Sequence, residues 1–146
     1  DGNGTADRAY AGDLHGNLWA FDLNSASPAA WGVAHSDVPL FTGRSNQPIT
    51  VKPIIIRHPT ESQGTDPNLL VLFGTGRFLT KADRSTTDTQ TFYGIWDNGD
   101  YAIDRNDLVE QNVGKAGSIR GIHSGLFYGD SPFEVAVREE SGRADQ

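Results

Sequence analysis

The residues best suited to chemistry lie at the start of the chain, where Asp1–Asp7 alternates oxygen-bearing side chains with small residues. Calcium prefers carboxylate, amide and carbonyl oxygens, and a glycine allows the tight turn that gathers them around the cation. If Gly4 is the turn glycine at the sixth position of a calcium loop, the closing bidentate Glu is replaced by Tyr10 and the first position precedes the chain. The sequence therefore predicts calcium binding in a longer parent chain, with these ligands supplied here: Asp1, Asn3, Thr5 through its main-chain carbonyl, and Asp7.

The competing interpretation of Asp1–Asp7 is a solvated terminus. It is stronger for this segment alone, because a missing carboxylate weakens a site that depends on ligand charge. The abrupt start at Asp1, without an initiator Met, leads us to expect a piece of a longer protein.

The remaining polar residues do not form a recognisable catalytic set. The chain has no cysteine, and its histidines do not share a metal-ligand spacing, so we expect surface or turn residues at His15, His35, His58 and His123. Ser124 follows His123 directly, and neighbours in a strand point to opposite faces, so the pair does not indicate a nucleophile and its base. The sequence predicts a protein that is not an enzyme.

The glycine-rich segment Gly74–Leu79 does not bind phosphate in the manner of a P-loop. It lacks the Gly-Lys-Ser/Thr ending and leads into no predicted helix. Glycines that let a strand turn sharply are the better explanation, and Arg77 is expected to pair with an acidic neighbour or to cap the turn.

Aromatic residues recur in two strand-like runs and could form an exposed platform for a sugar or peptide. Packing between propeller blades is the favoured alternative. The residues concerned are Trp19, Phe21, Phe92, Tyr93 and Trp96. Asp22 and Asp97 end these runs and are expected to bond turn amides.

A β-hairpin over Arg8–Leu23 is the clearest structural element. The runs Arg8–Gly12 and Asn17–Leu23 have strand character, and Asp13–Gly16 between them ends in the glycine that closes such turns. Alternation along the second run places its large hydrophobic side chains on one face, which we expect to be buried: Trp19, Phe21 and Leu23.

Further strands are predicted along the chain, and a long helix is not. Pro53 should break a run or place it at a sheet edge, and Asp104–Val113 has the alternative of a short capped helix. The predicted strand regions are Pro39–Thr42, Pro48–Arg57, Leu69–Phe73, Thr91–Asp97, Ser118–Tyr128 and Phe133–Glu139.

A loose repeat indicates the architecture. In both halves a strand ends in glycine, and a later strand of aromatic and apolar residues ends in Asp, as in Leu18–Asp22 and Phe92–Asp97. Blades of about 40 to 50 residues fit this pattern, and a ring needs at least four of them. We expect an all-β fold, a partial β-propeller of two to three blades of antiparallel strands with quinoprotein-like hairpins.

Charge and hydropathy exclude two classes of partner. A net charge of −7 argues against contact with a nucleic acid backbone. Apolar runs are strand-sized, well short of the roughly 20 residues of a transmembrane helix.

Five segments, in order, resemble the C-terminal propeller of the PilY family of bacterial type IV pili: Asp7–Leu23, Pro39–Thr42, Gln47–Thr50, Leu72–Leu79 and Gln90–Asp97. The resemblance covers residues 1–111, so we assign 1–111 to propeller blades and expect 112–146 to continue with further blade strands and a frayed end. PilY-type propellers are similar in carrying a short Asp-rich loop before this hairpin. An Asp at the position of Asp7 ends that loop.

The resemblance implies a binding and scaffold module of a pilus-associated surface protein that supports pilus assembly and adhesion under calcium control. Its partners would be pilin or minor pilin subunits and possible host surface ligands. Its location would be extracytoplasmic, at the pilus tip, the cell surface or the periplasm. Two alternatives stay open: a pyrroloquinoline quinone dehydrogenase, whose blades have similar hairpins, and a generic extracellular ligand-binding propeller.

Overall fold

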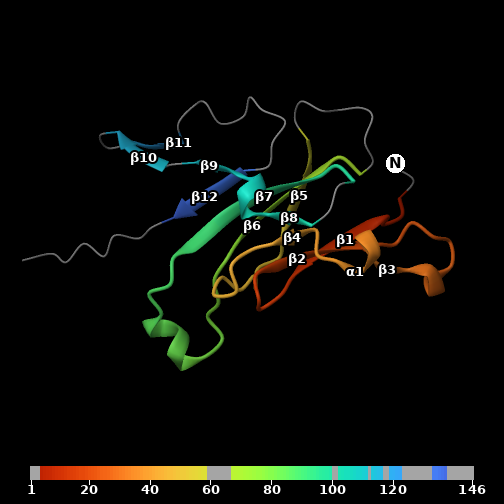
Figure 1. Ribbon diagram of the computed structural model, residues 1–146, viewed down its shortest axis with the longest axis horizontal. Coiled ribbons are helices and arrows are strands. Elements are labelled where there is room, and N and C mark those ends of the chain that lie inside the picture. The colour runs from red at the N-terminus through yellow and green to blue at the C-terminus, as the bar shows by residue number, and fades with distance from the viewer. Residues whose placement is uncertain are drawn as a thin grey trace, which may run out of the picture.

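The computed structural model describes residues 4–58, 67–99, 102–111, 113–116, 119–122 and 133–137. Over these residues the fold is all-β, with only short helical turns between the strands (Figure 1). The strands form three sheets, two of them five-stranded and one a two-stranded ladder. No helix of the described part is long and apolar enough to span a membrane. The predicted partial β-propeller is confirmed.

The first sheet is built on the predicted hairpin. Strands β1 (Arg8–Gly12) and β2 (Asn17–Asp22) pair antiparallel, with Arg8 opposite Asp22. Gly16 closes the turn at a φ of 84°, where a Cβ would also collide with the carbonyl oxygen of Arg44. The sheet is completed by β3 (Gly32–Val33), β4 (Phe41–Thr42) and β8 (Ile103–Asp104).

The prediction of which hairpin face is buried was wrong. Leu18 and Ala20 are 0% and 1% exposed, whereas Trp19 and Phe21 on the opposite face are only half-buried. The core at this point is shared with a second sheet that lies close to β2, and the smaller side chains allow that approach. Side-chain size along β2 is therefore a poor guide to its orientation.

The second sheet has the strand order β5-β6-β7-β12-β9. Pro53 immediately precedes β5, which is an edge strand, so both predicted consequences of that proline occur. β12 pairs antiparallel with β7 but parallel with β9, an addition to the expected antiparallel pattern. The strands are β5 (Ile54–Arg57), β6 (Leu69–Gly74), β7 (Gln90–Asp97), β9 (Val109–Gln111) and β12 (Phe133–Val137).

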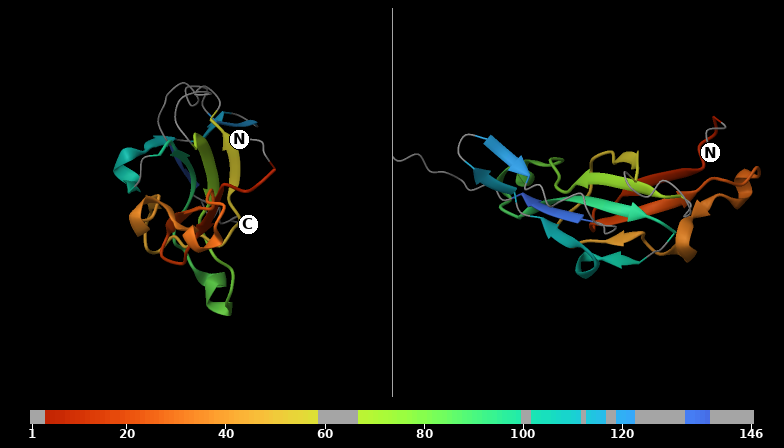
Figure 2. Two further views of the ribbon diagram at one scale, coloured as in Figure 1. Left: turned by 90° about the vertical axis from the view of Figure 1, so that its right-hand side faces the viewer. Right: turned by 90° about the horizontal axis from the view of Figure 1, so that it is seen from above.

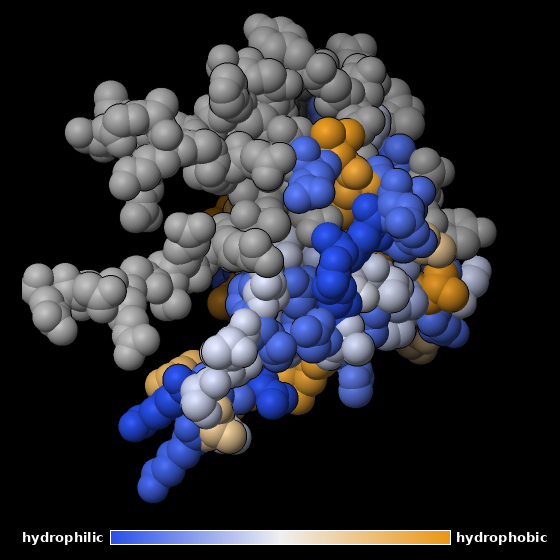
Figure 3. Space-filling view, turned by 60° about the vertical axis from the view of Figure 1, so that its left-hand side comes forward, coloured by the Kyte–Doolittle hydropathy of each residue, from blue (hydrophilic) through white to orange (hydrophobic). Residues whose placement is uncertain are grey.

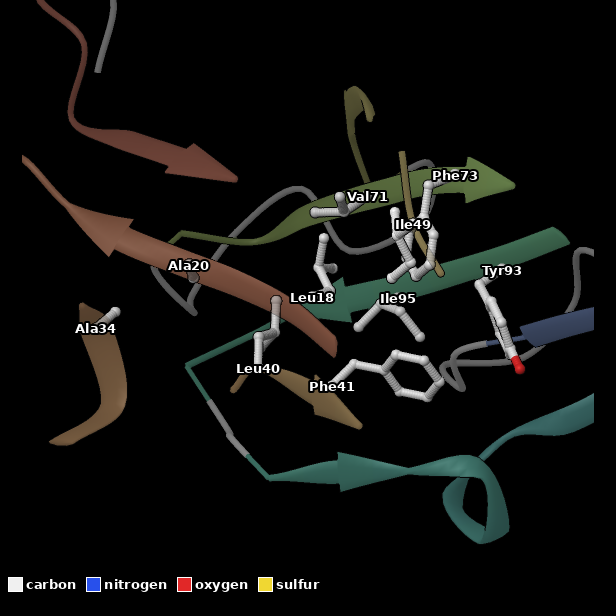
Figure 4. Close-up of a cluster of buried hydrophobic side chains, with 10 residues drawn as sticks. All are labelled: Leu18, Ala20, Ala34, Leu40, Phe41, Ile49, Val71, Phe73, Tyr93 and Ile95. Atoms are coloured by element: carbon white, nitrogen blue, oxygen red, sulfur yellow. The ribbon is translucent and has the colours of Figure 1, made fainter. Parts of the chain in front are cut away.

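The two sheets share one apolar core, which Figure 4 shows in close-up. At its centre the ring of Phe41 lies 4.8 Å from that of Tyr93 and 6.2 Å from that of Phe73. Aromatic pairs at these centroid separations add to the free energy gained by burial. The buried members are Leu18, Ala20, Ala34, Leu40, Phe41, Ile49, Val71, Phe73, Tyr93 and Ile95.

Asp104–Val113, for which a short helix was the alternative, forms one 3-10 turn and then a strand. Asp104 caps the 3-10 turn η3 (Arg105–Asp107) by accepting from the amide of Asn106, and β9 follows. The predicted cap is confirmed, but the longer helix is not formed. The third ladder pairs β10 (Val113–Ala116) with β11 (Ile119–Ile122). β11 lies inside the predicted strand region Ser118–Tyr128, whereas β10 falls outside the predicted strands. The division at residue 111 stays a prediction.

The other short helical elements lie in the connections between strands. Turns η1 (Pro28–Ala30) and α1 (Ala34–Asp37) link β2 to β4, and η2 (Lys81–Ser85) lies in the connection from β6 to β7. That connection projects away from both sheets, at the bottom of Figure 1 and of the left panel of Figure 2.

Candidate functional site

The predicted calcium loop leads directly into β1. Gly4 has a φ of 85°, the conformation expected of a turn glycine, and the Thr5 hydroxyl donates to the Asp7 carboxylate at 3.4 Å. The carbonyl of Asp7 accepts from the amide of Leu23 at 3.0 Å, which ties the loop to the end of the hairpin. Asp1 and Asn3 lie outside the described residues.

The donor chemistry of this loop suits calcium, because Thr5 and Asp7 offer only oxygen atoms. Calcium takes six to eight oxygen ligands, so these two residues could supply only part of a site. Among the described residues, His, Cys, Asp and Glu side chains do not gather in groups of three that could hold a metal. The calcium assignment stays a prediction that depends on Asp1, Asn3 and upstream ligands.

A buried carboxylate lies at the same end of the hairpin. The Asp97 side chain is 0% exposed at the end of β7, and its Oδ2 accepts from the Tyr10 hydroxyl at 2.7 Å. The Arg8 Nε lies 3.5 Å from the same oxygen, and His35 Nε2 lies 3.9 Å from Oδ1. We call Arg8, Tyr10, His35 and Asp97 the Asp97 cluster. It joins the two five-stranded sheets through α1 and β1.

The Asp97 cluster is built for support rather than for acid–base chemistry. Burial, followed by the negative charge of Asp97, raises the pKa of Tyr10 well above its usual range. Tyr10 is therefore a proton donor in a fixed hydrogen bond at neutral pH. The expected amide bond to Asp97 is confirmed, since Gly99 N donates to Oδ1 at 3.3 Å.

His35 reaches Asp97 from an unusual backbone. His35 and Ser36 both have φ 58° and ψ 41°, and Asp37 has a φ of 64°, so α1 is a left-handed turn. Each such residue costs roughly 1–2 kcal/mol relative to the right-handed form. Strain of this kind persists where surrounding contacts enforce it, and the His35 contact with Asp97 is one of them.

The hairpin turn is held by a second carboxylate. Asp13 accepts from the amides of His15 and Asn17, from the Asn17 side chain, and from Trp19 Nε1, all at 2.8–2.9 Å. Desolvation raises the pKa of Asp13, but these hydrogen bonds, led by that of Trp19, outweigh it and lower the pKa. Asp13 therefore fixes the turn and the Trp19 indole together.

The surface-or-turn prediction was right for His15, which is exposed, and for His35, which lies in the left-handed turn α1 although its side chain is buried; it was wrong for His58. His58 is 8% exposed and stacks on Trp96 with ring centroids 4.6 Å apart, and the His35 side chain is also 8% exposed. Both are buried because tertiary contacts from distant strands cover them. His123 and Ser124 lie outside the described residues.

Other predicted roles are confirmed. Asp22 accepts from the amide of Asn24 at 2.9 Å, and Arg77 pairs with Asp83 at 2.8 Å. Tyr93 is fully buried, as packing between blades requires, and it donates to Gln47 at 2.9 Å. Phe92, by contrast, is 36% exposed.

Sequence reasoning missed the link between Tyr10 and Asp97, which stand 87 positions apart. Local sequence gives no indication of such a pair. Asp13 was also missed, although an Asp followed by Gly and Asn within four residues is typical of a turn in which the carboxylate bonds backbone amides.

Two blade-like sheets that share a core, with an oxygen-rich loop before the first hairpin, define a partial β-propeller whose buried carboxylates hold turns and join the sheets. The family model for the PilY1 beta-propeller domain matches residues 1–117. The chain belongs to this family.

Relatives and a solved structure are similar over most of the chain. A type IV pilus biogenesis factor PilY1 homolog of Xylella fastidiosa is 38% identical over 70% of this chain and 7% of its own length. Type IV pilus biogenesis factor PilY1 of Pseudomonas aeruginosa is 34% identical over 76% of this chain and 12% of its own length. The crystal structure of the Pseudomonas aeruginosa PilY1 C-terminal domain superposes with a TM-score of 0.71 at 26% identity, covering 94% of this chain and 37% of that one. The chain thus spans a small part of the curated relatives it matches.

Proposed function

We propose that this chain is a binding and scaffold module of an extracytoplasmic, type IV pilus-associated protein. Its partners in this role are pilin or minor pilin subunits, and host surface ligands are further candidates through adhesion. The observation that carries the proposal is membership of the PilY1 propeller family over residues 1–117, together with relatives named as pilus biogenesis factors.

The described side chains support binding rather than catalysis. Asp13, Asp83 and Asp97 each have their carboxylate oxygens engaged by hydrogen bonds that hold turns or join sheets. Tyr10 stays protonated over the physiological range. A rigid platform of this kind suits recognition, because little conformational freedom is lost when a partner binds.

The test uses the parent protein in a piliated bacterium. Wild-type parent protein should co-sediment with sheared, purified pili, and deletion of residues 1–117 in frame should abolish co-sedimentation and lower the number of surface pili. A matched deletion of another domain controls for loss of protein. Unchanged piliation together with unchanged co-sedimentation would reject the proposal.

We further propose that calcium acts through the loop before β1, with Asp1, Asn3, Thr5 and Asp7 among its ligands. The support is the oxygen-only donor set and the turn conformation of Gly4. Calorimetry should detect calcium binding by a version extended upstream, weaker or no binding by the 146-residue chain, and a loss of binding in Asp7→Ala. Asp22→Ala is the matched control, because Asp22 lies opposite Arg8 in the hairpin and therefore close to Asp7. Absence of heat from the extended version would reject the calcium assignment alone.

A further inference from the structure

The connection between β6 and β7 forms an exposed tip, Arg77–Ser85, that the architecture of the sheets does not require. It projects from the body of the molecule in Figure 1 and in the left panel of Figure 2. Phe78 and Leu79 are 69% and 67% exposed, the highest values among the large hydrophobic side chains that the structure describes. Two adjacent apolar residues at the end of a projection are costly to leave in water, which calls for an explanation.

Hydrogen bonds hold the tip together, although none of its side chains belongs to the apolar core. One buried side chain, Asp83, holds it: its carboxylate accepts from Arg77 Nε and from the amides of Leu79 and Thr80, at 2.7–2.9 Å, and from the Thr80 hydroxyl at 3.0 Å. Bonds from the Thr80 amide, and then from its neighbours, lower the pKa of Asp83 to about 2, so the carboxylate stays ionised. The backbone that carries Phe78 and Leu79 is thus held in its turn before any partner arrives.

The charges around Phe78 favour a negative partner. Arg77 is matched by Asp83, while Lys81 and Arg84 are exposed, and the Arg84 guanidinium lies 5.8 Å from the centre of the Phe78 ring. The chain as a whole carries a net charge of −7. Figure 3 shows hydrophobic colour beside strongly hydrophilic colour at this lowest end of the molecule.

We propose that the Arg77–Ser85 tip is a docking element that inserts Phe78 and Leu79 into an apolar pocket with an acidic rim on a protein partner. Aromatic residues and arginine are enriched where binding energy concentrates in protein interfaces, and a preorganised loop loses little entropy on binding. The acidic rim of a pocket would act only on the positively charged tip that enters it, and not on the rest of the acidic chain. An anionic bilayer would present its negative charge to the whole acidic chain, which disfavours a membrane as the target.

The probe is purified pili from the source bacterium, mixed with the full-length parent protein. Only this choice of probe rests on the proposed function. Replacing both apolar residues (Phe78→Ser with Leu79→Ser) should weaken co-sedimentation at least tenfold, the loss typical of interface hot spots. Leu14→Ser, a 51% exposed leucine in the β1–β2 turn, is the matched control and should leave binding unchanged.

Charge reversal tests the acidic rim. Lys81→Glu with Arg84→Glu should weaken binding and remove its sensitivity to salt, because exposed charges are screened beyond about 10 Å at 0.1 M ionic strength. Lys52→Glu with Arg57→Glu makes the same change of net charge at exposed residues in and beside the β5 edge and should have no such effect. Far-UV circular dichroism and melting temperature should match wild type in every variant.

Three outcomes would overturn the docking element. The first is wild-type co-sedimentation by the Phe78, Leu79 double variant, which leaves the pilus function standing. The second is flotation of wild type, but not of that variant, with phosphatidylglycerol–phosphatidylethanolamine vesicles, which identifies a membrane contact instead. The third is hydrogen-exchange protection of the tip that is much stronger in the isolated parent protein than in the 146-residue chain, which shows that another part of the parent covers it. If wild type itself fails to bind pili, the proposed function fails first.

Discussion

Tyr10→Phe tests whether the Asp97 cluster holds the two sheets together. The substitution removes one hydroxyl that donates to a fully buried carboxylate at 2.7 Å, while Arg8 and Gly99 keep their contacts with Asp97. Hydrogen bonds to charged groups contribute about 1.5–3 kcal/mol, and those between neutral groups about 0.5–1.5 kcal/mol. We expect Tyr10→Phe to lower the free energy of unfolding by about 2 kcal/mol.

The matched control is Tyr93→Phe, which removes a hydroxyl that donates to the neutral side chain of Gln47 at 2.9 Å. Urea unfolding of the 146-residue chain, followed by tryptophan fluorescence, measures both variants. With a slope of about 2 kcal/mol per M, Tyr10→Phe should lower the midpoint by about 1 M and Tyr93→Phe by about half as much or less. Tyr93 is the more buried of the two, so an equal or larger loss for Tyr93→Phe would refute the charged-acceptor argument.

Two further measurements isolate the pair. In a double-mutant cycle, Tyr10→Phe and Asp97→Asn should show a coupling energy of about 1 kcal/mol or more. The raised pKa of Tyr10 gives a pH test: its contribution is fully present below the ordinary tyrosine pKa of about 10 and is lost as the pH rises above it. The stability difference between wild type and Tyr10→Phe should therefore shrink in alkali, and a constant difference would contradict it.

Three other predictions follow from the fold. Leu18→Ala should destabilise the chain by about 2–5 kcal/mol in urea unfolding, more than Phe21→Ala, and the reverse order would mean that the opposite face of β2 is the core. Ser36→Gly should raise stability by up to about 1 kcal/mol, because glycine tolerates the left-handed φ, and a loss would argue against the left-handed turn. Asp83 should hold its loop above about pH 4 and release it as the pH falls toward its pKa of about 2. Amide exchange of the residues that donate to Asp83 measures this, and Asp83→Asn should already exchange faster at neutral pH.

Local pattern was enough to predict most strands. The Arg8–Leu23 hairpin follows from a turn glycine between two strand-like runs, and the β5 edge follows from Pro53. The arrangement of the sheets relative to one another was beyond local pattern. Alternation along β2 shows that one face is buried, but which face depends on a second sheet that approaches Leu18 and Ala20.

The same limit explains why the candidate site was only partly predicted. Asp22 could be assigned because its partner lies nearby in sequence, as its bond to the amide of Asn24 shows, whereas the calcium role of Asp7 stays a prediction. Asp97 was given a turn-amide role, which it has, but its bond with Tyr10 crosses 87 positions and depends on how the hairpin docks against β7.

The position of Arg8 gives that long-range contact a consequence. Arg8 follows directly after Asp7, the last predicted calcium ligand, and its guanidinium contacts the carboxylate that also meets His35 in the strained turn. A change in the backbone at Asp7 must therefore be accommodated either by the bond from Leu23 to Asp7 or by the contact of Arg8 with Asp97. Because Asp97 is fully buried and cannot exchange its partners for water, the second route is the costlier one. The geometry thus favours a loop that adjusts at the hairpin end while the sheet junction behind it stays fixed.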